Sequence, residues 1–525
     1  MTAAEQTPNS DAVPTAAAWM AVGGALMGTF MALLDISVTN ASLPQIQGEI
    51  GATGTEGTWI GTGYLAAEIV MIPLTGWFSR LLGLRRFLII AGLLFLAFSV
   101  VCGLAGTLTQ MIIGRIGQGF AGGAMIPAGL TIIATRLTAK QRPLGFGVYA
   151  TVAVIAPVIG PILGGWLTEN FAWQWLFYIN LPLLIPQIVM LTLGIEDEPV
   201  QAVELKRADW LGILGLALSL GGLTVMLEEG QRENWFDSEL IVALAATAIS
   251  GAALVLYSQI THPHPVVKLR LLLTRSYGAV FFLITVMGAS AITMMYIVPV
   301  FLGAIARYNA QQTGFVMVYT GLGTFLIMPL ATVLMSRLDL RILVAAGMAM
   351  GATGCFLCLG LTADSAGLDF AWPLYFNGLG ITVAAMPLSQ AATLGLDERD
   401  IPDGTALFSM GRNVGGSLGL AATGVLLDRR LVFHSAQIEQ ATTANSVLAQ
   451  DRVTDLAALM AAQHGDAALA HLQALKLIAG EIQRQSLVMS FMDGFWVMGI
   501  AFVLAIPAAL LLRGGAIGAT TPGAH

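Results

Sequence analysis

The sequence predicts an all-helical protein that crosses a lipid bilayer many times. Of its 525 residues, 56% are hydrophobic and only 10% are charged, whereas soluble domains contain roughly 45–50% apolar and about 25% charged residues. Its mean hydropathy is +0.78, and apolar stretches of about 20 residues, the length of one helical span, recur along the chain. This composition excludes an ordinary soluble enzyme and a disordered chain, which requires low hydrophobicity.

Charge and motif content exclude further classes. The formal net charge is −7 and the bases are scattered, which argues against nucleic-acid binding. Three cysteines cannot form a disulfide framework. No lysine stands in a Gly-rich loop of the type that binds ATP phosphates, and no nucleophile or metal-ligand constellation is evident. We therefore expect no enzyme activity, no metal and no cofactor, with energy drawn from an ion gradient.

Hydropathy predicts fourteen spans in three blocks. A tail over 1–16, with acids and no base, precedes a six-helix bundle over 17–194, so its first span is expected to remain uncleaved. A linker over 195–275 holds two extra spans. A second six-helix bundle occupies 276–512 and includes a long periplasmic loop over 429–486, before a tail over 513–525. The predicted spans are 17–39, 57–78, 87–106, 108–135, 144–167, 174–194, 209–227, 240–259, 276–302, 313–335, 342–362, 370–395, 404–427 and 487–512.

Lysine and arginine predict the orientation of these spans. Fifteen of the 24 bases lie on one side, while the short loops on the other side carry only Arg232 and Arg307. Short loops rich in lysine and arginine stay in the cytoplasm. Both termini are therefore expected to be cytoplasmic.

An internal repeat relates the two bundles. Residues 72–74, 79–81 and 84–85 (Ile-Pro-Leu, Ser-Arg-Leu, Leu-Arg) are echoed at 328–330, 336–338 and 340–341 (Met-Pro-Leu, Ser-Arg-Leu, Leu-Arg). Halves repeated in the same orientation, with a site between them near the midplane, form a transporter architecture. A channel would need a filter-like loop, and none is evident in the sequence.

Among the charged residues inside predicted spans, we single out Asp35, Glu68, Arg115 and Arg412. A charge at the bilayer centre costs at least ~2.5–3.5 kcal/mol, which makes these residues functional candidates. Two acids and one base in the first bundle suggest carboxylates that load and release a proton as their distance from the base changes. The alternative is that the charges pair permanently and fix the packing of the helices, and Arg412 could equally bond neighbouring carbonyls.

Glycine and proline gather in the fifth span. Small residues allow helix backbones to approach closely, and prolines bend a helix where neighbours satisfy the freed carbonyls. This pattern favours a hinge, with ordinary close packing as the alternative. The residues are Gly147, Pro157, Gly160, Pro161, Gly164 and Gly165.

Over essentially its whole length the chain resembles the major facilitator superfamily, and within it the fourteen-span drug:H⁺ antiporters of the EmrB/QacA type. The resemblance rests on Asp35 within 34–44, on Arg115, Gln118 and Gly119 in the fourth span, on the fifth-span motif and on 173–182. It implies a multidrug efflux transporter of a bacterial inner membrane, which exports small lipophilic or amphipathic compounds by alternating access. The arginine of the fourth-span motif, Arg115 here, is associated with proton coupling in this family. Our own hypothesis from the residues is that Asp35 and Glu68 take up and release the proton while Arg115 tunes their pKa.

The loop after the second span departs from the superfamily's pattern. Gly76, Gly83, Arg85 and Arg86 fit the pattern of the cytoplasmic gate loop, but Arg80 stands where an acid is usual. The charge-locked gate of the superfamily is therefore expected to differ in this chain.

We expect the substrate cavity to lie between the bundles. Its predicted lining consists of Gln118, Met294, Met295, Tyr296, Phe325, Asn377 and Arg412.

The segment 429–486 is the only sizeable part expected outside the membrane. Leu469, Leu472, Leu475 and Ile478 recur at helical spacing and predict an amphipathic helix. The resemblance implies that this segment docks a periplasmic membrane-fusion adaptor, linked to an outer-membrane channel. The alternative is that the segment folds over the outer opening of the transporter itself.

Two other functions stay open from the sequence. One is proton-coupled metabolite import by the same fold, against which the fifth-span antiporter motif argues. The other is a non-transporting receptor or scaffold, in which the charges inside the membrane serve packing alone.

Overall fold

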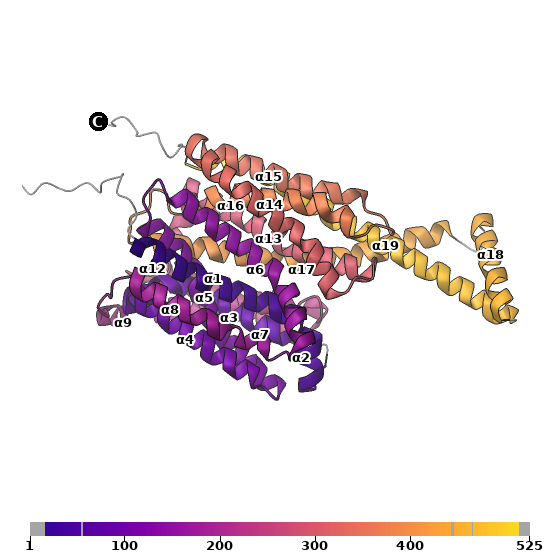
Figure 1. The fold of residues 1–525 in the computed structure, drawn as a ribbon, viewed down its shortest axis with the longest axis horizontal. Helices are drawn as coiled ribbons and strands as arrows, with labels where there is room; N and C mark the ends of the chain where they lie inside the picture. Colours follow the sequence, from indigo (N-terminus) through magenta and orange to yellow (C-terminus); the bar gives the residue numbers. More distant parts are fainter. Residues whose placement is uncertain (1–15, 54–55, 443–445, 465, 514–525) are drawn as a thin grey trace, which may run out of the picture.

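The computed structural model describes residues 16–53, 56–442, 446–464 and 466–513, and it is built from helices that run side by side (Figure 1). Each of the fourteen predicted spans falls on helical structure in this part of the chain. The first bundle consists of α1 (Ala16–Ala41), α3 (Trp59–Leu82), α4 (Leu84–Gly103), α5 (Leu108–Arg136), α6 (Arg142–Asn170) and the broken pair α7 (Trp175–Tyr178) and α8 (Asn180–Gly194). A short helix, α2 (Leu43–Ile50), follows α1.

The second bundle has the same plan. It consists of α13 (Arg275–Ala304), α14 (Ala310–Arg337), α15 (Leu340–Leu357), α16 (Ala371–Ala391), α17 (Ile401–Ala441) and α19 (Ala467–Ala505). In the first bundle α5 packs against α3 and α4, and in the second α16 packs in the same way against α14 and α15. The internal repeat of the sequence is therefore a repeat of packing.

Twelve segments of the described chain are long and apolar enough to cross a membrane. The helices α16 and α17 provide the other two spans. Their lower hydropathy has a structural cause, because both carry polar side chains, among them Asn377, Gln390, Asp403 and Asn413, on faces that pack inside the protein. A span surrounded by other helices does not need an apolar residue on every face.

Glycine allows the central helices to approach closely. A Cβ atom at Gly119 of α5 would lie 2.2 Å from the carbonyl oxygen of Tyr64, and one at Gly123 would lie 2.4 Å from that of Glu68. Both carbonyls belong to α3, so α3 and α5 touch through their backbones. This contact fixes the depth at which the charged residues of the two helices face each other.

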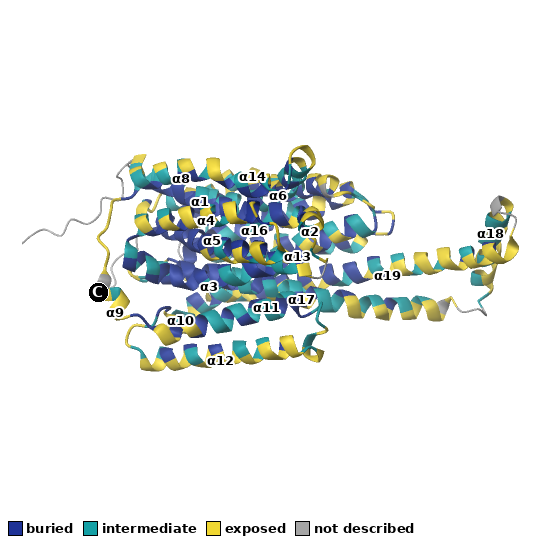
Figure 2. Ribbon diagram, turned by 90° about the horizontal axis from the view of Figure 1, so that it is seen from below, coloured by how far each residue is buried: buried dark blue, intermediate teal, exposed yellow. Residues whose placement is uncertain are grey.

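The two inserted spans form a hairpin on one side of the molecule. The first arm of this helical hairpin consists of α10 (Trp210–Leu216), a π-helical turn over Ala217–Gly221 and α11 (Gly222–Glu229). The second arm is α12 (Glu239–Thr261). The first arm of the hairpin contacts α3 and α17, whereas α12 is mostly exposed along the edge of the molecule (Figure 2). A short helix, α9 (Ala202–Lys206), precedes the hairpin.

The segment 429–486, expected as a long connection that contains an amphipathic helix, is largely helical in its described part. The helices α17 and α19 continue past the bundles and are joined by α18 (Val447–His464), which gives a projecting helical extension (Figure 1). Alanine, leucine, glutamine and arginine favour helix, and the side chain of Asp466 caps the start of α19 by accepting from the N–H groups of Ala468 (2.9 Å) and Leu469 (3.2 Å).

The packed face of the extension differs from the expected one. Leu469, Leu472 and Leu475 are 46%, 64% and 44% exposed, whereas Ala470 and Ala474 are fully buried. Since α18 packs against α19, small alanine side chains make the close contact and the leucines remain on the outside.

Candidate functional site

Asp35 and Arg115 form an ion pair inside the first bundle. Both side chains are fully buried, and Arg115 Nη1 donates to Asp35 Oδ2. Arg115 Nε donates to the carbonyl oxygen of Ile60 at 3.2 Å, and the guanidinium lies 4.3 Å from the centre of the Tyr64 ring. These contacts hold the cation between α1, α3 and α5 and leave the carboxylate dependent on it for charge balance.

Amide and hydroxyl groups surround the other oxygen of Asp35. Gln118 Nε2 and Asn180 Nδ2 donate to Oδ1 at 3.1 and 3.0 Å. The same two amides donate to Ser99 Oγ at 2.8 and 3.2 Å. The Asp35 carboxylate of α1 thus accepts bonds from α5 and α8, and the same donors are bonded in turn to residues of α3 and α4, which makes one continuous buried network.

Glu68 lies at the interface between the bundles. Its side chain is 2% exposed, and its Oε1 accepts a 2.9 Å hydrogen bond from Asn413 Nδ2 of α17. Within the described residues its Oε2 has no hydrogen-bond partner. Arg412 and Arg115 both lie within electrostatic range of it. A proton could occupy Oε2 without displacing any existing bond.

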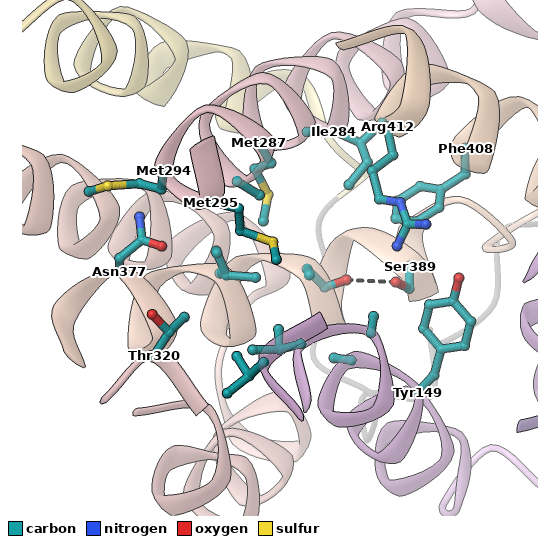
Figure 3. Close-up of a pocket in the computed structure, with 18 of the residues that line it drawn as sticks. Tyr149, Ile284, Met287, Met294, Met295, Thr320, Asn377, Ser389, Phe408 and Arg412 are labelled. Atoms are coloured by element: carbon teal, nitrogen blue, oxygen red, sulfur yellow. Dashed lines mark hydrogen bonds between the residues drawn. The ribbon is translucent and has the colours of Figure 1, made fainter. Parts of the chain in front are cut away.

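A cavity lies between the bundles, and Arg412, which is within electrostatic range of Glu68, is one of the residues that line it. It is enclosed by α6 of the first bundle and by α13, α14, α16 and α17 of the second (Figure 3). Four residues of the predicted lining are found there: Met294, Met295, Asn377 and Arg412. The guanidinium of Arg412 points toward Ser389 and Tyr149 (Figure 3).

Three other residues of the predicted lining lie elsewhere. Tyr296 and Phe325 are 41% and 61% exposed on the outside of the bundle, and Gln118 belongs to the Asp35 cluster. Consecutive residues on a helix are separated by about 100°, so Tyr296 faces away from the cavity that Met295 lines. Hydropathy within one span does not reveal which face is turned inward.

The cavity wall is mainly apolar. Alanine, isoleucine, valine, phenylalanine and four methionines make up most of it. Asn377 Nδ2 and Thr320 Oγ1 lack hydrogen-bond partners among the residues that the structure describes, while Ser389 donates to the Ala385 carbonyl at 2.7 Å (Figure 3). Methionine adapts its shape to different neighbours, and a few polar groups in such a wall suit amphipathic molecules of variable outline.

The predicted hinge helix α6 connects the bundles. Pro161 has no N–H group, so the carbonyl of Pro157 loses its helical donor, and Ser37 Oγ of α1 donates to that carbonyl at 2.8 Å. A Cβ atom at Gly160 would lie 2.4 Å from Ser37 Oγ, whereas one at Gly165 would meet nothing within 4 Å.

Other positions of this motif contact both bundles. A Cβ atom at Gly164 would lie 3.0 Å from the carbonyl oxygen of Val38 in α1, and one at Gly147 would lie 2.9 Å from Met386 in α16. The glycines of α6 therefore serve close contacts with both bundles, and Gly165 is the exception among the predicted positions.

The gate-loop arginines also join different parts of the protein. Arg80 Nη1 lies 3.4 Å from Asp403 Oδ1 at the start of α17. Arg86 pairs with Asp197 at 2.6 Å, and Arg85 donates to the Ile195 carbonyl at 3.5 Å. In this chain the loop therefore supplies the base, Arg80, and the opposite bundle supplies the acid, Asp403.

Two glycines and a threonine pair complete this junction. A Cβ atom at Gly76 would lie 2.8 Å from Asp403 Oδ1, and Gly83 adopts φ = +78° between α3 and α4. The hydroxyls of Thr131 and Thr405 lie 2.6 Å apart across the same end of the bundles. At this end the two bundles are therefore joined by contacts of α3 and α5 with α17.

Sequence reasoning missed an acidic pair on the inserted hairpin. Glu229, 1% exposed, accepts from Thr62 of α3 at 2.7 Å and pairs with Arg232 at 2.6 Å, while Glu228 accepts from Ser417 of α17 at 3.1 Å. The signal was present, because two adjacent acids end an apolar span. Hydropathy placed them at the boundary of the span, and nothing in the sequence showed that the hairpin contacts both bundles.

Comparison with known proteins agrees with this architecture. The profile of the Major Facilitator Superfamily matches residues 25–420. The crystal structure of the human organic anion transporter MFSD10 superimposes with a TM-score of 0.57 at 13% identity, covering 94% of this chain and 99% of that one. The chain belongs to the Major Facilitator Superfamily, a family of transporters rather than enzymes.

Its relatives place it more narrowly. The Colistin resistance protein EmrB of Acinetobacter baumannii is 31% identical over 509 residues, which cover 95% of this chain and 98% of that protein. The Multidrug export protein EmrB of Escherichia coli is 28% identical over 482 residues, which cover 91% and 92%. Within the superfamily, the chain is a multi-pass membrane protein of the EmrB type.

Proposed function

We propose that this protein exports small lipophilic or amphipathic compounds across the bacterial inner membrane in exchange for protons, by alternating access. One observation carries the proposal: Glu68 of the first bundle is hydrogen-bonded to Asn413 of the second and lies within electrostatic range of Arg412, which lines an apolar cavity. Protonation of this carboxylate would change a hydrogen bond between the two bundles, which move relative to each other in alternating access. The relatives' names, which refer to colistin resistance and multidrug export, support the same reading.

Asp35, Glu68 and Arg115 have separate roles in this proposal. Glu68 takes up the proton in the state open to the outside and releases it in the state open to the cytoplasm. Asp35, bound to Arg115 and to two amides, responds through those bonds. Because proton and substrate shift the equilibrium only through different affinities for the two states, the compound and the proton must favour opposite states or compete for one.

The test is proton release from inverted membrane vesicles with an acidic interior. Addition of lipophilic drugs or bile salts should trigger proton release by the wild type. Glu68→Gln and Asp35→Asn should lose most of this release while reaching normal levels in the membrane. Equal release by both variants and the wild type would remove these carboxylates from coupling. Uptake of a metabolite together with protons would favour the import alternative.

The extension is proposed as the docking site of a periplasmic membrane-fusion adaptor, itself connected to an outer-membrane channel. This assignment places both termini in the cytoplasm and the extension outside. Leu469, Leu472 and Leu475 give the extension an uncovered apolar face within its described part. Replacing these leucines with glutamate should abolish co-purification with the adaptor. His471→Glu, a change on the same helix between them, should not, and retained binding by the leucine variant would refute the docking site.

A further inference from the structure

A second cavity lies at one end of the second bundle, away from the transport site. It is lined by the start of α13, by Arg341 near the start of α15, by the turn after α16 and by the last described residues of the chain, including Arg513. Three arginines line it: Arg275, Arg341 and Arg513. None of these residues takes part in the proton site, the substrate cavity or the junction at Arg80.

Two of the arginines are held in place by the backbone. Arg341 Nε donates to the Leu512 carbonyl at 2.9 Å, and Arg513 Nη1 donates to the Gly395 carbonyl at 3.5 Å. The Arg513 N–H group also donates to Ser276 Oγ at 3.0 Å. A guanidinium has five N–H donors, so each retains donors for a further acceptor. These bonds hold Arg341 and Arg513 at the cavity, where Arg275 is the third cation.

The acids at the cavity do not cancel this charge. Asp397 and Asp400 also line it, but Asp400 is paired with Lys268, which is not among the lining residues. Three guanidinium groups therefore face one acid that has no cationic partner among the ion pairs of the described chain. The cavity carries an excess of positive charge and suits an anion with several acceptor oxygens, such as a phosphate.

The position of the cavity favours a lipid headgroup over a free ion as the source of such a phosphate. Its residues lie at or within a few residues of the ends of predicted spans (275–276, 341, 394–400 and 510–513), which is the depth of the lipid headgroups. Leu394, Leu510 and Leu511 also line it and are 39%, 66% and 39% exposed. An ion from solution would gain nothing from these leucines, whereas the acyl chains of a lipid would cover them.

We propose that this cavity binds the phosphate group of an anionic phospholipid, with the acyl chains lying along the exposed leucines. Arg275 and Arg513 would bind the phosphate oxygens. Arg341 would hold the segment around Leu512 in position as well as add positive charge. The lipid would thereby join the start of α13 to the last described residues of the second bundle.

The test measures lipid binding to the purified full-length protein in a neutral detergent. Phosphatidylglycerol is titrated against phosphatidylcholine, with bound lipid counted by native mass spectrometry and the melting temperature recorded in parallel. The tested protein is the double variant Arg275→Gln/Arg513→Gln, which leaves the Arg341–Leu512 bond intact. The control is Arg337→Gln, which removes an exposed arginine at the end of α14 that does not line the cavity.

The proposal expects preferential binding of phosphatidylglycerol by the wild type and by Arg337→Gln, with a rise in melting temperature that saturates. The double variant should bind it about tenfold more weakly or worse, because two charge-assisted hydrogen bonds are lost. Equal affinity in the wild type and double variant would overturn the site. An equal temperature rise with inorganic phosphate alone would overturn the lipid assignment. Because transport is not the readout, failure here leaves the proposed export function untouched.

Discussion

Glu68 and Asn413 are 345 positions apart in sequence and share a 2.9 Å hydrogen bond across the two bundles. The bond makes a buried carboxylate of the first bundle depend on the position of the second. Protonation of Glu68, if it differs between two arrangements of the bundles, would shift the equilibrium between them.

Glu68→Gln is expected to uncouple transport while preserving the fold. Glutamine keeps the size of the side chain and an oxygen that can accept from Asn413, but it does not bind and release a proton. Compound-triggered proton release should fall at least about tenfold, the range expected when a group that carries protons is removed. Direct binding of the same compound should persist. The control is Glu56→Gln, at an exposed position outside the bundle; similar losses in both variants would contradict a specific role for Glu68.

The Asp35–Arg115 pair should behave as a unit in stability measurements. Removing one partner leaves the other buried without a counter-charge, which typically costs about 3–5 kcal/mol. Asp35→Ala and Arg115→Ala should therefore each lower the melting temperature in detergent, whereas the double variant should lower it by much less than the sum. Strict additivity would show that the two residues act independently, despite their contact.

The contact of Arg80 with Asp403 should control access to the cavity from that end. Asp403→Asn should speed labelling of a cysteine introduced at Met294 by a membrane-impermeant maleimide supplied from the Arg80 side. The change should be severalfold at most, because a partly exposed ion pair contributes about 0.2–1 kcal/mol. The charge exchange Arg80→Asp/Asp403→Arg should restore slow labelling. Arg86→Gln, which breaks a pair within the first half of the chain, provides the control.

The glycines of α6 are expected to differ sharply in tolerance. Gly160→Ala places a methyl group against Ser37 and disturbs its bond to Pro157, so we expect a loss of about 1–3 kcal/mol and reduced export. Gly165→Ala meets open space and should be neutral or slightly stabilising, because alanine favours helix. Export rates and melting temperatures of the two variants measure the contrast, and equal tolerance would argue against α6 packing closely on α1.

Neighbouring residues of α13 offer a test of the substrate cavity. Ala291 lines the cavity, while Ile292 beside it is 43% exposed on the outside. Ala291→Phe should fill the cavity and reduce export of bulky compounds more than that of small ones. Ile292→Phe should leave drug resistance unchanged in a growth assay. A cavity that does not bind substrate would give the same resistance for both variants.

Sequence alone predicted the parts that depend on composition and local pattern. Asp35, Glu68 and Arg115 stood out because charge is rare in an apolar span, and helical spans were found because each needs about 20 apolar residues. Which residues meet depends instead on helix rotation and on contacts between distant segments. The position of Phe325 on the outer surface, the partnership of Arg80 with Asp403 and the bridging position of Glu228 and Glu229 all depend on that geometry.

One uninterrupted helix, α17, carries Asp403, Arg412 and Asn413 and then continues into the extension. With 41 residues and a rise of 1.5 Å per residue, it is about 60 Å long. A helix of this length moves as a stiff rod, so a small tilt at the contact with Glu68 displaces its far end more than the residues at the contact. If the two halves move relative to each other, the extension would therefore move through a larger distance than the bundle to which α17 belongs.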